Sequence, residues 1–389
     1  MAGDQLVVAG PTVVAGYPWF GDWSRDTCTS YEGLLLETGR IDEGRMLLER
    51  AAASISEGML ANTADTGGTE YDTVVGTLWF LHAIDRHVAR TGDVDLAATL
   101  APALRAIVKH HLAGTRFGIR VDDDGLLTWG VPGFSPLGHP RAAPREPSDP
   151  EGLFRSALTW MDARVDGVPV TGRHGKPVEV NALWVNGLAA IAGLLGRAGA
   201  DASEVEALLD TARASFSRRF PCPDGVGLFD VVDIPADAAP AGSGGNDASL
   251  RPNQLLAVSL PHAPLDPASP AARAAVAACG PLLTSLGLRS LTPGSPGCTG
   301  RHRGGPERDR AYHQGTVWPW LVGPCVDAAA RVGVDTDGAL AGLEAHLAEW
   351  GLGSVSETAD GDPPHAATGC PFQAWSVAEV LRARRSLFP

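Results

Sequence analysis

The sequence predicts an all-α protein, an (α/α)6 barrel in which six helical hairpins close into a ring. Two observations lead to this fold class. Apolar residues recur at the helical spacing i, i+3, i+4 and i+7 in eleven segments, and the connections between these segments alternate between short turns and long polar loops. Hairpins whose short turns all lie at one end bring their long loops together at the other end, which becomes the functional face.

Helical periodicity places the eleven helices at residues 27–39, 42–58, 71–91, 93–114, 178–199, 201–219, 250–261, 267–286, 312–333, 335–350 and 371–384. Strand patterns are few: a hairpin within 118–130 and short strands near 5–15 and 226–233. The Asp122–Asp124 run at the hairpin lacks the alternate spacing of a calcium-binding loop, so it is interpreted as a polar turn.

The short connections each combine a glycine helix stop with an Asp helix start, at residues 38–42, 91–93, 198–201 and 333–335. The long connections each lead into an odd-numbered helix, at residues 16–26, 62–72, 128–181, 242–254, 301–318 and 351–375. Six long loops imply six hairpins, although only eleven of the twelve helices are found. No linker of domain-splitting length occurs, so residues 1–389 are expected to form one catalytic domain, with Pro/Ala/Gly-rich joints at 132–150 and 235–246.

Composition restricts the possible partners. The 389 residues are 44% apolar and carry a net charge of −14, which argues against nucleic acid or an anionic membrane surface but permits a neutral substrate. No apolar run of membrane length and no signal-peptide pattern are found. The six cysteines lack metal or disulfide spacing, so reduced thiols, no metal, no cofactor and a cytoplasmic location are expected. Motifs for acyl transfer, dinucleotides, nucleoside triphosphates and zinc peptidases are missing.

Residues 158–186 contain the mixture of side chains that a sugar site requires. Sugar rings stack on indoles, and their hydroxyls bond to carboxylates, amides and guanidinium groups. An acid packed against Trp160 and Met161 is expected to have a raised pKa, which suits Asp162 to general acid catalysis. A solvated surface loop is the alternative. The candidate ligands in this stretch are Trp160, Arg173, Glu179 and Asn181.

Four further loops carry candidate sugar-binding residues. In the first loop, a sugar ring can stack on Trp19 or Trp23, and Arg25 with Asp26 can bind two neighbouring hydroxyls of that sugar. The alternative for Asp26 is that it caps a helix. The other three loops contribute Arg251, Asn253 and Gln254; His313, Gln314 and Trp318; and Gln373 and Trp375. For Arg251–Gln254 the alternative is a proline at a helix start, and for Trp318 it is a core aromatic.

The last long loop carries Glu357 in a Gly-rich, open polar stretch, and this carboxylate is expected on the same face as Asp162. Two facing carboxylates are the arrangement of glycoside hydrolysis. A separation of about 6.5–9.5 Å leaves room for a water and gives inversion, whereas about 5–5.5 Å gives retention.

These motifs resemble those of the amylo-α-1,6-glucosidase domain of glycogen debranching enzymes. They run in family order from about residue 13 to 384: residues 15–26, 159–163, 177–184, 251–254, 312–320, 356–357 and 373–376. The resemblance implies an inverting (α/α)6 glycosidase that needs no cofactor and releases glucose from α-1,6-linked stubs of an α-glucan, glycogen or limit dextrin. It implies that Asp162 is the general acid and Glu357 the base, with Glu179 as an alternative acid or a hydroxyl ligand.

The sequence departs from the family pattern at four positions. Ser24 stands where the family usually has Gly, Gly172 where Pro is usual, Asp72 where Asn is usual and Val75 where Asp is usual. The chain also begins close to the barrel, without the β-rich domain that precedes it in many microbial members. The alternatives are another six-hairpin exo-α-glucosidase, similar to glucoamylase or trehalase, and a non-catalytic glucan-binding remnant.

Overall fold

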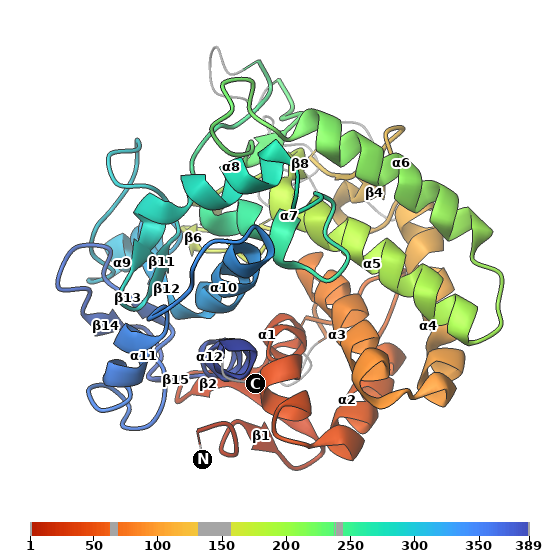
Figure 1. Cartoon of the computed structure of the whole chain (residues 1–389), viewed down its shortest axis with the longest axis horizontal. Helices are drawn as coiled ribbons and strands as arrows, with labels where there is room; N and C mark the ends of the chain where they lie inside the picture. Colours follow the sequence, from red (N-terminus) through yellow and green to blue (C-terminus); the bar gives the residue numbers. More distant parts are fainter. Residues whose placement is uncertain (1, 63–68, 131–156, 237, 239–243, 388–389) are drawn as a thin grey trace.

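The computed structural model describes residues 2–62, 69–130, 157–236, 238 and 244–387. Six helical segments stand around a common axis, and each packs against the next (Figure 1). In order these are α1 (Ser24–Thr29, extended by the π-helical turn η1, Glu32–Leu36), α3 (Val75–Thr91), α5 (Val178–Arg197), η4 and α7 (Pro252–Leu255 and Leu256–Ser259), η6 and α10 (Pro319–Leu321 and Val322–Arg331) and α12 (Ala374–Leu387). The last, α12, packs against α1 and closes the ring.

Five outer helices alternate with the inner ones along the described part of the chain. They are α2 (Ile41–Ala53), α4 (Val94–Ala113), α6 (Ser203–Arg219), α8 (Pro270–Ala278) and α11 (Ala341–His346). These eleven segments correspond to the eleven helices expected from the sequence. The short helix α9 (Pro306–Ala311) was not expected and lies within a long loop.

The turn between α3 and α4 has the predicted glycine helix stop and Asp helix start. Gly92 ends α3 in the left-handed region with φ 73°, and the Asp93 side chain caps α4 by accepting a hydrogen bond from the Leu96 N–H at 2.9 Å. At this end of the ring, neighbouring inner helices are also joined by ion pairs. Arg382 of α12 binds Asp327 of α10 at 2.5 Å, and Arg86 of α3 binds Glu32 of η1 at 3.1 Å.

Several predicted helices were too long, among them the one expected over 335–350, which is found only over Ala341–His346. For two others the sequence gives the reason. The helix expected over 267–286 ends at Ala278, because a Gly-Pro step follows and residues 283–289 form the hairpin of β10 (Leu283–Thr284) and β11 (Gly287–Arg289). The helix expected over 312–333 starts only at Pro319. A residue before proline is disfavoured in the helical region, and Trp318 is accordingly extended in β12 (Val317–Trp318).

Two small sheets join loops that are distant in sequence. One has the order β10-β11-β12-β13-β14, completed by β13 (Thr358–Ala359) and β14 (Ala367–Thr368). The other connects β1 (Val7–Val8), β2 (Thr12–Tyr17), β3 (Phe20–Asp22) and β15 (Phe372–Gln373). Because β15 pairs with β2, Phe372 opposite Tyr17, the last long loop is fixed beside the first.

The predicted hairpin within 118–130 is confirmed as β4 (Arg120–Val121) and β5 (Leu127–Thr128), and β9 (Val231–Val232) pairs with β8 (Lys176–Pro177). A further hairpin, β6 (Arg164–Val165) with β7 (Val168–Pro169), was not predicted. The buried ammonium of Lys176 lies 2.8–2.9 Å from carboxylates of Asp122, Asp124 and Asp233. The acidic turn therefore neutralises a lysine of the protein itself.

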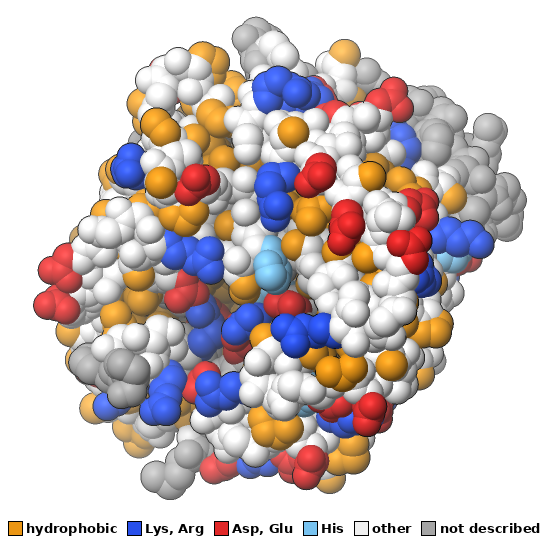
Figure 2. Space-filling model, turned by 45° about the vertical axis from the view of Figure 1, so that its right-hand side comes forward, with side chains coloured by type: hydrophobic (Ala, Val, Ile, Leu, Met, Phe, Trp, Pro, Cys, Tyr) orange, Lys and Arg blue, Asp and Glu red, His pale blue; other side chains and the backbone are white. Residues whose placement is uncertain are grey.

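One helix, α5, is long and apolar enough to cross a membrane, contrary to the expectation that no such run exists. However, 83% of its most apolar window is buried within the protein, as in a core helix. On the face shown in Figure 2, acidic and basic side chains are interspersed. No disulfide joins any of the six cysteines, and the described residues contain no group of three potential metal ligands.

Candidate functional site

A pocket at the long-loop end of the ring is built from four of the six long loops. It encloses about 440 Å³, including the part open to solvent. Its lining residues are Ala15, Phe20, Trp23, Arg25, Asp26, Trp160, Asp162, Tyr312, His313, Trp318, Glu357, Gln373 and Trp375. The two candidate catalytic carboxylates therefore share one pocket.

Glu357 is the buried carboxylate of this pair. One carboxylate oxygen accepts a hydrogen bond from the Tyr312 hydroxyl, and the other accepts from the Cys370 N–H at 2.9 Å. Burial raises the pKa of Glu357 to about 7, although both hydrogen bonds act in the opposite direction. The expectation that this side chain lies in an open polar loop was wrong, because Tyr312 and the Cys370 backbone contact it and it is buried.

Asp162 has a more open environment than the sequence predicted. Its side chain is 31% exposed, and it accepts a hydrogen bond from Arg25 at 2.5 Å. The burial expected for Asp162 is thus found at Glu357 instead. Arg25 also binds Asp26 at 3.0 Å, and its guanidinium lies over the rings of Trp23 and Trp375, at 5.5 and 5.3 Å from their centroids.

Aromatic rings form the opposite wall of the pocket. The indole of Trp160 meets Trp318 edge-to-face at 5.2 Å, and His313 stacks on Trp318 at 5.1 Å. Burial, with Arg25 and Arg251 nearby, holds the pKa of His313 well below its usual value, so the imidazole is neutral at pH 7. The ring is therefore available to a ligand as both a hydrogen-bond donor and an acceptor.

Several buried polar atoms of the pocket residues have no hydrogen-bond partner within the described structure. They are both ring nitrogens of His313, the indole nitrogen of Trp375 and the amide oxygen of Gln373. Buried polar groups in native proteins are nearly always paired, so a cluster of free ones in a pocket indicates a polar ligand. Donors, acceptors and apolar ring faces together match the two kinds of surface that a sugar presents.

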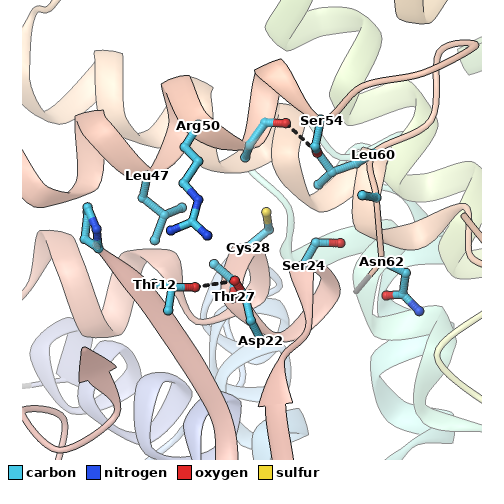
Figure 3. Close-up of a pocket in the computed structure, with 13 residues that line it drawn as sticks. Thr12, Asp22, Ser24, Thr27, Cys28, Leu47, Arg50, Ser54, Leu60 and Asn62 are labelled. Carbon is cyan, nitrogen blue, oxygen red and sulfur yellow. Dashed lines mark hydrogen bonds between the residues drawn. The ribbon is translucent and has the colours of Figure 1, made fainter. Parts of the chain in front are cut away.

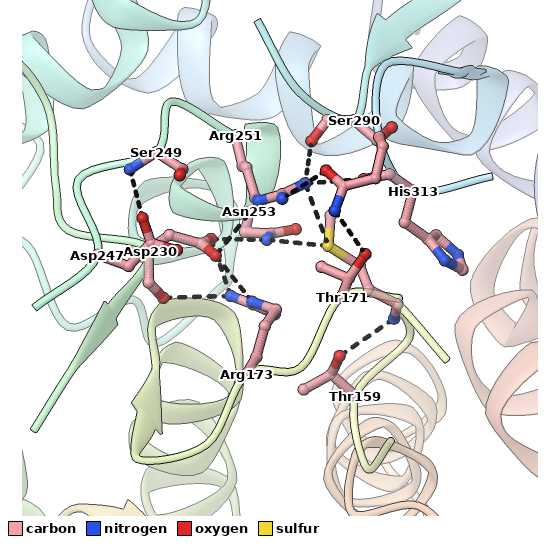
Figure 4. A network of polar contacts seen from close by, with 12 residues as sticks. Thr159, Thr171, Arg173, Asp230, Asp247, Ser249, Arg251, Asn253, Ser290 and His313 are labelled. Atoms are coloured by element: carbon pink, nitrogen blue, oxygen red, sulfur yellow. Dashed lines mark hydrogen bonds and ion pairs between the residues drawn. The ribbon is translucent and has the colours of Figure 1, made fainter. Parts of the chain in front are cut away.

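A charged network beside the pocket holds several of the other predicted residues (Figure 4). Arg173 is buried between Asp230, at 2.8 Å from its Nε, and Glu179, at 2.6 Å from its Nη2. Asn253 donates to Asp230 at 2.8 Å and accepts from the Trp160 indole at 2.9 Å. Through its hydrogen bond to Asn253, the Trp160 indole is held in place by this network. Their polar groups already have partners within the protein, and the direct binding of substrate by Arg173, Glu179 and Asn253 stays a prediction.

Four other predicted ligands also have structural contacts instead of a place on the pocket wall. Arg251 donates to the backbone oxygens of Ser290 and His313, at 3.0 and 2.8 Å, and to Gln314 at 2.9 Å. Asn181 bonds to both backbone groups of Leu127, and Gln254 accepts from the Leu228 N–H at 2.9 Å. The residues that hold loops in this way are Asn181, Arg251, Gln254 and Gln314. Trp19 lies outside the pocket, 63% exposed.

Besides the apolar lining residues Ala15 and Phe20, two polar residues at or beside the site were missed. Tyr312 lies directly before the predicted His313, so the motif contained it, but nothing in the sequence indicated its contact with Glu357. Asp230 carried no recognisable signal, because its partners Arg173 and Asn253 lie 57 and 23 residues away.

A second pocket of about 530 Å³ lies between β2, α1 and α2 (Figure 3). It contains no facing pair of carboxylates. Ser24, one of the four departures from the family pattern, lines this pocket. Asp72 accepts a hydrogen bond from Asn62 at 2.8 Å, and Val75 is buried in the core. These three residues do not line the pocket that holds Asp162 and Glu357.

Comparison with known proteins identifies the family. A family model described as amylo-alpha-1,6-glucosidase matches residues 1–137 and 151–382. The glycogen debranching enzyme of Saccharomyces cerevisiae is 24% identical over an alignment 390 residues long. This alignment covers 80% of this chain but only 25% of the yeast enzyme. The chain thus spans about a quarter of that relative.

Solved structures confirm the fold class. The GH63 mannosylglycerate hydrolase of Thermus thermophilus, in complex with Tris and D-glycerate, superimposes with a TM-score of 0.68 at 13% identity, covering 99% of both chains. The GH78 rhamnosidase of Bacillus sp. GL1 superimposes with a TM-score of 0.58 at 16% identity, covering 94% of this chain and 31% of the rhamnosidase. Both belong to the (α/α)6 toroid class. With the sequence match over nearly its whole length, the chain belongs to the amylo-alpha-1,6-glucosidase family of glycoside hydrolases.

Proposed function

We propose that this protein hydrolyses the α-1,6-linked glucosyl stub of a limit dextrin with inversion, with Asp162 as general acid and Glu357 as general base. The observation that carries the proposal is the pairing of two carboxylates in unlike environments within one pocket that also offers aromatic walls and free polar groups. A difference in environment between two carboxylates separates an acid from a base. The order of the two roles follows the family motifs, because the raised pKa of Glu357 taken alone would also suit an acid. The family match and the yeast relative support the substrate.

In the proposed reaction Glu357 removes a proton from water, and the water oxygen bonds to the anomeric carbon as the glycosidic bond breaks. Asp162 delivers its proton to the departing oxygen. A pKa near 7 leaves a large fraction of Glu357 ionised at neutral pH, as a base requires. Asp162 is bound by Arg25 in the free protein, so a sugar hydroxyl must replace it on Arg25 before Asp162 can act as an acid.

The direct test is glucose release from phosphorylase limit dextrin, followed by NMR so that the first anomer formed is seen. The proposal expects β-glucose from limit dextrin and little turnover of maltose or trehalose. Turnover of maltose or trehalose alone would identify another exo-α-glucosidase of this fold. Binding of dextrin without turnover of any of the three would identify a glucan-binding remnant, and either result would overturn the proposal.

Tyr312→Phe is expected to shift the acidic limb of the pH–rate profile upward by about one pH unit. The Tyr312 hydroxyl lowers the pKa of Glu357 by its hydrogen bond. A hydrogen bond to a charged group contributes about 1.5–3 kcal/mol, and a pKa shift of one unit corresponds to about 1.4 kcal/mol. Its loss raises that pKa further above its usual range. Since the base acts only when ionised, activity then appears at higher pH.

A matched control for this substitution is Tyr31→Phe. Tyr31 is completely buried, and its hydroxyl bonds to His87 at 2.7 Å outside the pocket. The control should leave the pH profile in place while removing a comparable buried hydrogen bond. An unshifted profile in Tyr312→Phe would show that Tyr312 does not set the ionisation of the base.

A further inference from the structure

The proposed substrate has a part that the pocket does not receive. If a glucosyl stub enters the pocket, the chain that carries it stays outside and must lie across the surface next to the mouth. The inference below rests on the proposed function and concerns this outer chain.

Three large apolar side chains are exposed around the strands that carry part of the pocket. Trp19 is 63% exposed, Trp350 is 40% exposed and Leu352 is 80% exposed. Exposed apolar residues that gather at one place, in contrast to single scattered ones, commonly mark a binding surface.

Strand pairing brings these three side chains to one region. Phe372 of β15 pairs with Tyr17 of β2, and the Trp19 N–H closes the turn after β2 by donating to the Gly16 carbonyl at 3.1 Å. On the other side, a Cβ placed on Gly351 would lie 2.7 Å from the Pro371 carbonyl oxygen and 3.6 Å from the Phe372 ring. The loop that carries Trp350 and Leu352 therefore rests on β15, and β15 rests on β2.

The same two strands reach the pocket. Ala15 of β2 and Gln373 of β15 both line it, as does Phe20, which directly follows Trp19. The β2–β15 pair therefore connects the segments that carry the exposed side chains to the wall of the pocket.

We propose that Trp19, Trp350 and Leu352 form an outer platform for the α-1,4-linked glucan chain that carries the stub. The apolar faces of glucose rings stack on indoles and pack on aliphatic side chains without requiring charge. A protein partner is a poorer match, because three side chains provide far less than the roughly 800 Å² that each side of a standard protein interface buries.

The test compares two substrates, of which only one has a part that stays outside the pocket. Limit dextrin carries the outer chain, whereas α-glucosyl fluoride fills the pocket alone. In Trp19→Ala and Trp350→Ala, the ratio of kcat/KM on limit dextrin to kcat/KM on the fluoride is expected to fall about tenfold each, within the range of aromatic stacking. Leu352→Ser should give a smaller fall in the same ratio. The matched control is Val334→Ala, an exposed apolar residue in a short turn at the opposite end of the ring.

The outcomes separate this inference from the proposed function. Wild-type turnover of both substrates with an unchanged ratio in the variants would overturn the platform and leave the proposed function standing. If the wild type turns over neither substrate, retardation by glycogen in native gels, lost in Trp19→Ala and Trp350→Ala but kept in Val334→Ala, would still support the platform. A dimer that the variants convert to monomers, without a change in ratio or retardation, would show that a second copy of the chain occupies this surface, and would overturn the proposal.

Discussion

Glu357→Gln and Asp162→Asn are each expected to lower kcat on limit dextrin by about 10²–10⁴-fold, the usual contribution of a general acid or base. The two variants should differ on α-glucosyl fluoride. Fluoride departs without being protonated, so Asp162→Asn should retain most of its activity on this substrate. Glu357→Gln should lose it, because activation of the attacking water is still needed.

The reverse pattern would exchange the two roles. An exchange of roles is physically reasonable, because the raised pKa of Glu357 also permits it to hold a proton near pH 7 and so to act as an acid. Full activity of either variant on limit dextrin would remove that residue from the mechanism. Glu344→Gln, which changes a largely exposed carboxylate on α11, is the control and should leave both activities unchanged.

Arg173→Met is expected to lower the free energy of unfolding by about 3–5 kcal/mol, the effect of breaking a buried ion pair by removing one partner. Arg173 is the cation between Glu179 and Asp230, and all three side chains are almost completely buried. Its removal leaves two carboxylates close together in a low-dielectric region. Denaturant unfolding monitored by tryptophan fluorescence measures the change.

The control is Arg384→Met, which removes an exposed partner of Glu344 and should change stability by no more than about 1 kcal/mol. The comparison also decides between two interpretations of Arg173. If the variant has unchanged stability but a raised KM, Arg173 contacts the sugar directly, as the sequence suggested. Loss of stability with an unchanged KM in the remaining folded enzyme is the result expected from the contacts in Figure 4.

The ring of helices could be predicted because its signals are local. Apolar periodicity, glycine stops and the alternation of loop lengths can all be recognised within a few residues of chain. The same signals located the pocket, since Trp23, Arg25, Asp162 and Glu357 all come from long loops. The two-residue strands β12 and β13 could not be predicted, because each is defined by pairing with a distant partner and not by its own pattern.

Environments within the site depended on contacts across long stretches of sequence. The sequence placed Asp162 beside an indole and so suggested burial, but Arg25, 137 residues earlier, pairs with it. Glu357 follows a glycine-rich segment that suggested exposure, yet Tyr312, 45 residues earlier, lies against it. Residue type was therefore a better guide to which side chains form the pocket than to the ionisation of each one.

The closure of the ring has a consequence for how the protein is made. Trp23, Arg25 and Asp26 are synthesised well before Gln373 and Trp375, which complete the same pocket, since Asp26 and Gln373 are 347 residues apart. Until then β2 lacks β15, and α1 lacks the helix α12 that covers it. Contacts between residues so far apart in sequence form slowly. Until they form, the uncovered apolar faces are prone to aggregation. Nascent chains of this protein should therefore depend on chaperones until α12 has been synthesised.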